Sequence, residues 1–152
     1  MIVVERIGPR DREALEALLR ANHLPLDGLD LALPLSVVAR DGDELIGCAA
    51  VERYGSAGLL RSVCVEERHR STGVGQALVD AVEGLAAGGG ISELFLLTET
   101  AAGWFPRLGY EAAVRADAPA EMAASPEFVS ACPVSASVLR KRLTPAAAAA
   151  RG

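Results

Sequence analysis

The stretch Leu59-Leu60-Arg61-Ser62-Val63-Cys64-Val65, which continues through 66–69 into Arg70-Ser71-Thr72-Gly73-Val74-Gly75, decides the fold that we expect. The apolar run at 59–65 predicts a strand. Beyond the glycines, Leu78, Val79, Val82 and Leu85 recur at the spacing of one helical face, which predicts a helix over 76–85. The chain therefore passes from a strand into a helix through a glycine-bearing loop.

Such a loop is suited to binding an anion. The first amides of a helix have no partners within the helix, and the helix dipole is positive at that end. Gly73 and Gly75 would let a phosphate approach the backbone without meeting a Cβ atom, and Arg70 adds a fixed positive charge. Gln76 and Leu78 exclude the Walker A loop and the dinucleotide fingerprint, because each stands where those motifs require another residue.

The loop 70–75 resembles the acyl-CoA loop of the GNAT N-acetyltransferase superfamily, Gln/Arg-x-x-Gly-x-Gly/Ala, which holds the pyrophosphate of acetyl-CoA. Two further stretches resemble the same superfamily. Residues 61–70 look like its fourth strand entering the loop. The strand 94–98, a short helix at 101–108 and Gly109-Tyr110 look like its closing pattern, with Gly109 as a left-handed helix terminator. The resemblance covers about residues 2–143.

This resemblance implies a fold of the α/β (α+β) class. The expected fold is a single acyl-CoA N-acyltransferase domain, with a mixed, mostly antiparallel sheet flanked by helices and strands that splay at the CoA site. A narrower similarity to the arsenic-resistance N-acetyltransferase group rests on 60–63, 96–105 and 130–136. Members of that group are usually named from neighbouring genes, so this similarity says little about substrate.

Composition fits one domain over 1–143, followed by a low-complexity tail at 144–152 that we expect to be flexible. The net charge of −5 argues against nucleic acid as a partner. We expect neither a signal peptide nor a membrane span, and hence a cytoplasmic protein. Cys48, Cys64 and Cys132 are widely separated and form no CxxC pair, which predicts free thiols and no metal site.

The rest of the chain is expected to follow a regular order. We predict strands at 2–7, 35–40, 45–53, 59–65, 93–97 and 134–143, with a turn at 55–58. Helices are expected from about Pro9 to Ala21 and over 76–85, with a glycine run at 88–90 ending the second. A loop or short helix is expected at 26–33, and a small helical excursion at 116–126.

The resemblance implies acetyl-CoA as the cosubstrate and assigns its contacts by position. The strand backbone at Val63, Cys64 and Val65 would pair with the pantetheine arm. The residues assigned to the pyrophosphate are Arg70, Ser71, Thr72, Gly73, Val74 and Gly75. Thr98 and Phe105 also fall on cofactor-binding positions. They stand where many members have an asparagine and a tyrosine, and that tyrosine protonates the leaving thiolate.

Phe105 cannot donate a proton, so this chain departs from the superfamily pattern at the general acid. Another group, or water, would protonate the thiolate, or the thiolate would leave unassisted. Tyr110 is expected in the core. Glu99 is the first candidate for the general base, with capping near Thr98 or Thr100 as the alternative role for this segment. Ser62 is a second polar residue that the fourth strand offers to catalysis.

Four residues are candidates for acceptor binding. Arg61 is unusual in an apolar strand, and its planar fork would suit a substrate carboxylate; the alternatives are a partner such as Glu52 or Glu99, or exposure at a strand end. His23 would lie in the acceptor wall, whereas His69 is expected at the surface beside the phosphate loop. Cys132 and Ser135 would line the pocket floor, with a bulge or turn as the alternative.

The sequence therefore predicts an acetyl-CoA-dependent N-acetyltransferase that acts on a small amine, with an anionic or amino-acid-like acceptor attacking directly in a ternary complex. One alternative is protein N-acetylation. Another is a non-catalytic acyl-CoA-binding regulatory module, because the usual tyrosine is missing. A scaffold that does not bind CoA is a third reading, and an apolar edge in the last strands would suit a homodimer.

Overall fold

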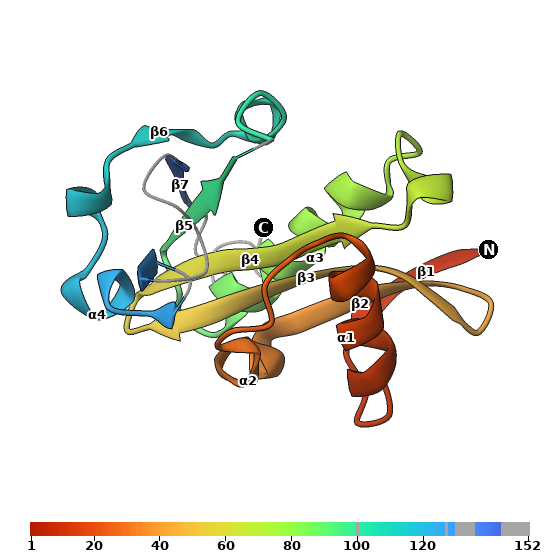
Figure 1. Cartoon of the computed structure of the whole chain (residues 1–152). Helices are drawn as coiled ribbons and strands as arrows, with labels where there is room; N and C mark the ends of the chain where they lie inside the picture. Colours follow the sequence, from red (N-terminus) through yellow and green to blue (C-terminus); the bar gives the residue numbers. More distant parts are fainter. Residues whose placement is uncertain (100, 127, 130–135, 144–152) are drawn as a thin grey trace.

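Seven strands form one mixed sheet in the computed structural model, which describes residues 1–99, 101–126, 128–129 and 136–143 (Figure 1). The strands are β1 (Ile2–Arg6), β2 (Ser36–Asp41), β3 (Glu44–Tyr54), β4 (Ala57–Val65), β5 (Glu93–Thr98), β6 (Glu111–Ala113) and β7 (Ser137–Arg142). Their order across the sheet is β1-β2-β3-β4-β5-β7-β6, and β4–β5 is the parallel pair. This arrangement confirms the predicted mixed, mostly antiparallel α/β fold.

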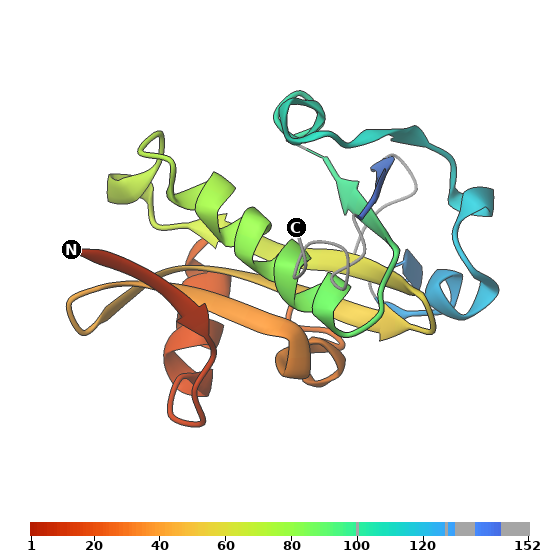
Figure 2. The same ribbon diagram turned by 180° about the vertical axis from the view of Figure 1, so that it is seen from behind.

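Helices cover both faces of the sheet. Helices α1 (Arg12–Ala21) and α2 (Leu29–Ala32) lie on the face turned forward in Figure 1, and α3 (Val74–Gly88) lies on the opposite face, as Figure 2 shows. The described chain also contains the short helix α4 (Ala120–Ala123) and four 3-10 helices. These are η1 (Leu33–Leu35), η2 (Glu67–His69), η3 (Phe105–Leu108) and η4 (Arg115–Asp117). No helix in the described ranges is long and apolar enough to span a bilayer.

The core lies on both sides of the central strands because their residues are apolar on both faces. Leu78, Val79 and Val82 of α3 are fully buried against one face, as the helical spacing predicted. On the other face, Leu15 and Leu19 of α1 pack against β2–β4. Burying one such side chain stabilises the fold by about 1.5–3 kcal/mol, so these two helices are held mainly by their apolar stripes.

A β-bulge interrupts the β3–β4 ladder at Ser62. Ala50 pairs with Arg61 and Cys48 pairs with Cys64, so Ala49 alone stands opposite two residues of β4. Ser62 has a φ of 57°, a left-handed conformation that costs a non-glycine residue energy. Because side chains alternate along a strand, the extra residue returns Arg61 and Cys64 to the face that α1 and α2 cover.

β4 and β5 part soon after they begin to pair. Within the described part of the chain their parallel pairing extends from Ala57–Glu93 to Leu59–Phe95 and stops there. β5 continues to Thr98 beside β7, while β4 continues to Val65 beside β3. The edge of β4 beyond the bulge is therefore open toward β5, which confirms the expected splay.

Several boundaries differ from those that the sequence predicted. The helix expected at 101–108 is a turn followed by the 3-10 helix Phe105–Leu108, since Pro106 cannot donate to an α-helical ladder. α1 begins at Arg12 rather than Pro9, and β4 begins at Ala57 inside the predicted turn. Gly109 has a φ of 97° and ends η3 in the left-handed conformation, as expected. The predicted tail at 144–152 lies outside the described residues.

Asp11 ties the start of α1 to β2. Its carboxylate accepts hydrogen bonds from Arg40 at 2.5 and 2.9 Å and from the Gly8 amide at 2.6 Å, and it is 8% exposed. The hydrogen bond from Arg40 lowers the pKa of Asp11, against the opposing effect of burial. This contact fixes the helix whose far end reaches the pocket described below.

We expect Asp11→Asn to destabilise the protein by about 1.5–3 kcal/mol at pH 7, since it removes a charged hydrogen-bond acceptor. A carboxyl whose folded pKa is lowered stabilises the fold above its unfolded pKa of about 3.9, and that stability is lost as the pH falls through the folded pKa. The difference between variant and wild type should therefore shrink below about pH 4. Urea unfolding across a pH series measures it; a difference that stays constant down to acid pH would contradict this assignment.

Candidate functional site

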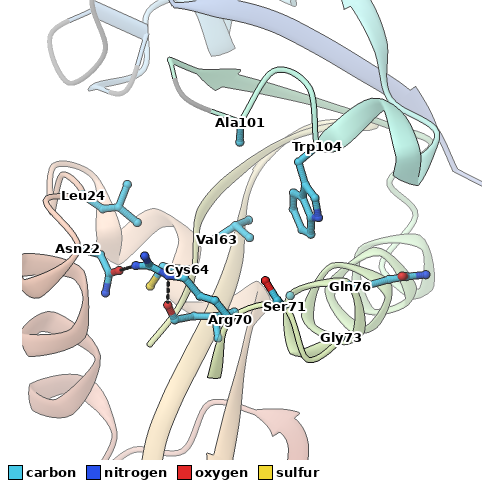
Figure 3. A pocket seen from close by; sticks show the side chains of 12 residues that line it. Asn22, Leu24, Val63, Cys64, Arg70, Ser71, Gly73, Gln76, Ala101 and Trp104 are labelled. Atoms are coloured by element: carbon cyan, nitrogen blue, oxygen red, sulfur yellow. Dashed lines mark hydrogen bonds between the residues drawn. The ribbon is translucent and has the colours of Figure 1, made fainter. Parts of the chain in front are cut away.

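A cavity of about 490 Å³ opens where β4 leaves β5 (Figure 3). It lies between the end of α1 and the start of α3, and two segments that are distant in sequence therefore form its opposite walls. The lining residues are Asn22, Leu24, Val63, Cys64, Val65, Arg70, Ser71, Gly73, Gly75, Gln76, Ala101 and Trp104. Seven of the residues predicted to contact the cofactor are on this wall: Val63, Cys64, Val65, Arg70, Ser71, Gly73 and Gly75.

The phosphate loop meets the cavity at the N-terminus of α3. Gly73 is the residue before the helix and has a φ of 89°. A Cβ built on Gly73 would meet nothing within 4 Å, so the space beside it is open. The Ala77 amide donates to the Gly73 carbonyl at 3.1 Å, which is the first bond of a helical ladder that begins at the N-cap Gly73. The amides of the first turn that precede Ala77 have no acceptor within a helix, which suits them to binding an anion.

Arg70 connects the two walls of the cavity. Its Nε donates to the Val65 carbonyl at 3.0 Å, and its Nη2 donates to Oδ1 of Asn22 at the end of α1, as the dashed lines in Figure 3 show. The guanidinium is thereby held at the mouth of the phosphate loop. Asn22 was not predicted as a site residue, because it directly follows the predicted end of the first helix at Ala21.

Trp104 covers the phosphate loop from the opposite side. A Cβ on Gly75 would come within 3.2 Å of Cζ2 of Trp104, so the indole lies close against the backbone of the loop. The indole packs edge-to-face on Phe105, with ring centroids 4.9 Å apart. The sequence analysis missed Trp104 as a site residue. As the one tryptophan of the chain, four residues before Leu108-Gly109, it offered a signal that could have marked it.

The other predicted cofactor contacts lie outside this lining. Phe105 is buried against Trp104 and Tyr110, and Val74, the first residue of α3, is buried in the core. Thr72 donates through Oγ1 to the His69 carbonyl, and Thr98 accepts through Oγ1 from the Ala101 amide at 3.0 Å. Thr98 therefore caps the turn before η3, the alternative role that the sequence offered for this segment.

Arg61 forms a buried ion pair with Glu52. Nη1 of Arg61 lies 2.7 Å from Oε2 of Glu52, and both side chains are 0% exposed. Further donors of Arg61 bind the carbonyls of Pro25 and Asp27 and the hydroxyl of Ser62. The Glu52 partner that the sequence left open as an alternative is thus present. The guanidinium is also covered by the segment at 25–28.

The same ion pair is enclosed by two further residues. A Cβ on Gly28 would lie 3.2 Å from Nη1 of Arg61 and 3.3 Å from Oε2 of Glu52, and its φ of 72° favours glycine, so the backbone packs tightly on the ion pair there. The Tyr54 hydroxyl donates to Oε1 of Glu52 at 2.5 Å. Burial and this carboxylate raise the pKa of Tyr54 to about 12, so the phenol stays protonated at neutral pH.

The candidate catalytic residues and His23 also lie outside the lining of the cavity. Glu99 is exposed, and Ser62 is buried in the bulge. His23 is exposed with a φ of 57°, between the lining residues Asn22 and Leu24. The roles predicted for these three residues stay predictions. Cys132 and Ser135 lie outside the described residues.

Two more titratable residues have structural partners. The Tyr110 hydroxyl is buried and donates to Glu83 at 2.8 Å, and burial followed by the Glu83 charge raises the pKa of Tyr110. Tyr110 is therefore in the core, as expected. His69 lies beside the phosphate loop with Nε2 3.2 Å from Asp41 and Nδ1 3.5 Å from Glu66, so it anchors η2 to the β2–β3 turn.

Comparison with known sequences identifies the region that contains this cavity. Residues 34–112 match the model of the acetyltransferase (GNAT) domain. Among its relatives, the amino-acid acetyltransferase of Mannheimia succiniciproducens is 30% identical over 121 residues, which is 78% of this chain and 26% of that protein. The chain therefore spans about a quarter of the length of this relative.

Solved structures share the fold. The N-acetylglutamate synthase of Neisseria gonorrhoeae, crystallised with coenzyme A and N-acetyl-glutamate, superposes with a TM-score of 0.81 at 21% identity, over 95% of this chain and 35% of the synthase. A Mycobacterium tuberculosis protein crystallised with CoA gives a TM-score of 0.78 at 23% identity, over 93% of this chain and 99% of its own. At these identities the likeness establishes the fold.

Proposed function

This chain belongs to the GNAT acetyltransferase family, and we propose that it transfers the acetyl group of acetyl-CoA to the amine of a small, amino-acid-like acceptor. The observation that carries the proposal is the cavity at the parting of β4 and β5, with an anion-binding turn at one end. The relative named amino-acid acetyltransferase supports the choice of acceptor class.

The residues around the cavity fit acetyl-CoA. The volume of the cavity, about 490 Å³, is in the range of small-molecule binding sites. The turn at Gly73 and the cation of Arg70 suit a pyrophosphate. The open edge of β4 at Val63–Val65 offers backbone groups to the amides of a pantetheine arm, much as a strand offers them to a neighbouring strand. When bound, the cosubstrate supplies an activated acetyl thioester.

In the proposed mechanism, the chain acts chiefly by positioning. The acceptor amine attacks directly in a ternary complex, and holding the two reactants in line supplies much of the rate. Backbone amides of β4 beyond the bulge would polarise the carbonyl. Glu99 is the proposed base, acting through water because its side chain is exposed, and Ser62 is the second candidate. With phenylalanine at position 105, the thiolate leaves with water or unassisted.

The proposed anchor of the acceptor is Arg61. In the present geometry its donors bind Glu52 and the carbonyls of Pro25 and Asp27. A substrate carboxylate would have to replace the two carbonyls, which requires the segment at 25–28 to move. His23, Cys132 and Ser135 belong to the same proposed acceptor site by resemblance.

The test is a thiol-release assay with acetyl-CoA and matched acceptors. We expect L-amino acids to react at least about 10-fold faster than the corresponding amines without the carboxylate, because a charged hydrogen bond to Arg61 is lost in the latter. L-leucine and isopentylamine form one such pair. Equal rates for both members of each pair would contradict the amino-acid-like acceptor.

A second candidate function is a non-catalytic acyl-CoA-binding module. The observation in its favour is Phe105, which stands where a proton donor is usual and is buried among aromatic rings. This function would give acetyl-CoA binding in a calorimetric titration with no thiol release for any amine. Protein N-acetylation would instead give release with peptide acceptors alone. A homodimer, a cytoplasmic location and a link to arsenic resistance stay predictions.

A further inference from the structure

Cys48 and Cys64 face each other across the β3–β4 ladder. They are paired in register, and their Sγ atoms lie 3.6 Å apart. Both are free thiols and both are buried. Facing positions in an antiparallel pair bring Cβ atoms close enough for a disulfide, so bridging these two requires mainly a movement of the sulfurs to about 2.05 Å.

The bulge at Ser62 creates this pair. From Tyr54–Ala57 to Ala50–Arg61 the ladder follows one register, and continuing it would place Val63 opposite Cys48. The extra residue moves Cys64 into that position instead. A strained residue thus brings two thiols together beside the cavity.

The two thiols differ in their access to the cavity. Cys64 lines it together with Asn22 and Leu24, and is 8% exposed. Cys48 lies behind it at 2% exposure and donates to the Ser62 carbonyl at 3.0 Å. The hydrogen bond with Cys64 and then burial raise the pKa of Cys48, which keeps it protonated. A reagent in the cavity therefore meets Cys64 first.

We propose that Cys64 undergoes thiol–disulfide exchange with a CoA-containing disulfide held in the cavity, and that Cys48 then resolves the adduct into a Cys48–Cys64 disulfide. The proposal rests on the proposed function, because the cavity must accept CoA. It assigns a modification site to the pair. In the direct-attack mechanism proposed above, acetyl transfer does not use these thiols.

The exchange balances without another oxidant. The thiolate of Cys64 attacks one sulfur of CoA disulfide, which forms a Cys64–CoA disulfide and releases one CoA thiolate that takes up the Cys64 proton through water. The sulfur of Cys48 then attacks Cys64, and the second CoA thiolate leaves with the Cys48 proton. Two protein thiols and one CoA disulfide thus give one protein disulfide and two CoA thiols. The raised pKa of Cys48 makes the second step the slower one at neutral pH.

Intact-mass spectrometry on a Cys132→Ser background tests the proposal. With CoA disulfide, we expect Cys48→Ser to gain one CoA, Cys64→Ser to gain none, and the parent to lose two hydrogens after a transient CoA adduct. Pantethine has the same disulfide and pantetheine arms but lacks the phosphorylated nucleotides, and it should react at least about 10-fold more slowly, because binding at the phosphate loop raises the local concentration of reagent. A CoA adduct on Cys64→Ser, or none on Cys48→Ser, would overturn the assignment.

Two controls separate this proposal from the proposed function. Thermal unfolding shows whether each variant is folded, and Cys48→Ala provides a second trapping variant. Calorimetry with acetyl-CoA under reducing conditions tests binding alone. If acetyl-CoA binds and CoA disulfide leaves Cys48→Ser unmodified, the exchange is refuted and the transferase proposal stands. If acetyl-CoA does not bind and the two disulfides react equally, the proposed function fails and the exchange fails with it.

Discussion

Replacing Arg61 by methionine is expected to lower the free energy of unfolding by about 3–5 kcal/mol, a large effect for one residue. The change leaves the carboxylate of Glu52 buried without its cation, and both side chains are 0% exposed. It also removes the donors that hold the carbonyls of Pro25 and Asp27. Urea unfolding of the purified variant at pH 7 measures the loss.

A double variant separates the unpaired charge from lost packing. Glu52→Gln keeps an oxygen that can accept from the Tyr54 hydroxyl and removes the charge. We expect Arg61→Met/Glu52→Gln to be more stable than Arg61→Met alone by about 1–3 kcal/mol, because the double variant buries no unpaired charge. The stability changes at the two ends of one ion pair are therefore not additive. If the loss of unfolding free energy in the double variant equals the sum of the losses in Arg61→Met and Glu52→Gln, the two residues are not coupled.

The second large effect is expected at the phosphate loop, where Gly73→Glu should weaken acetyl-CoA binding by about 100-fold or more, since like charges placed together cost several kcal/mol. The open space beside Gly73 is where the carboxylate would stand, at the end of α3 that is meant to receive a phosphate. Isothermal titration calorimetry measures the change.

Gly73→Ala is the matched control. Both variants place a side chain at a φ of 89°, so both carry the same backbone strain, but alanine adds no charge. We expect the alanine variant to be less stable by about 1 kcal/mol and to retain most of the binding. If both variants lose binding equally, loop geometry rather than charge explains the loss, and the pyrophosphate assignment is unsupported.

Elements with strong periodicity were predictable, because their signals are local. The α3 leucine and valine positions follow one helical face and are buried as expected. The strands β2, β3 and β4 followed from short turns between apolar runs, and the structure pairs them antiparallel. The cavity residues at 63–65 and the loop residues Arg70, Ser71, Gly73 and Gly75 were assigned differently, through the resemblance of this segment to the acetyltransferase superfamily.

What could not be predicted depends on contacts between distant segments. The residue type of Ser62 does not predict its left-handed φ, since serine also occurs in regular strands. The partner of Arg61 depends on that strand register, so Glu52 remained one of several alternatives. Trp104 and Asn22 reach the cavity from opposite sides of the fold, and neither lies in a motif that specifies a phosphate site.

The single extra residue in β4 has a consequence for comparing and engineering such chains. A variant one residue shorter at position 62 would continue the register of Ala50–Arg61, so Val63 would stand opposite Ala49 and Cys64 would stay opposite Cys48. Because side chains alternate along a regular strand, Arg61 and Cys64 would keep the face that they share now. A one-residue gap at this position in a sequence alignment would therefore leave the cavity wall and the core matched on both sides of it.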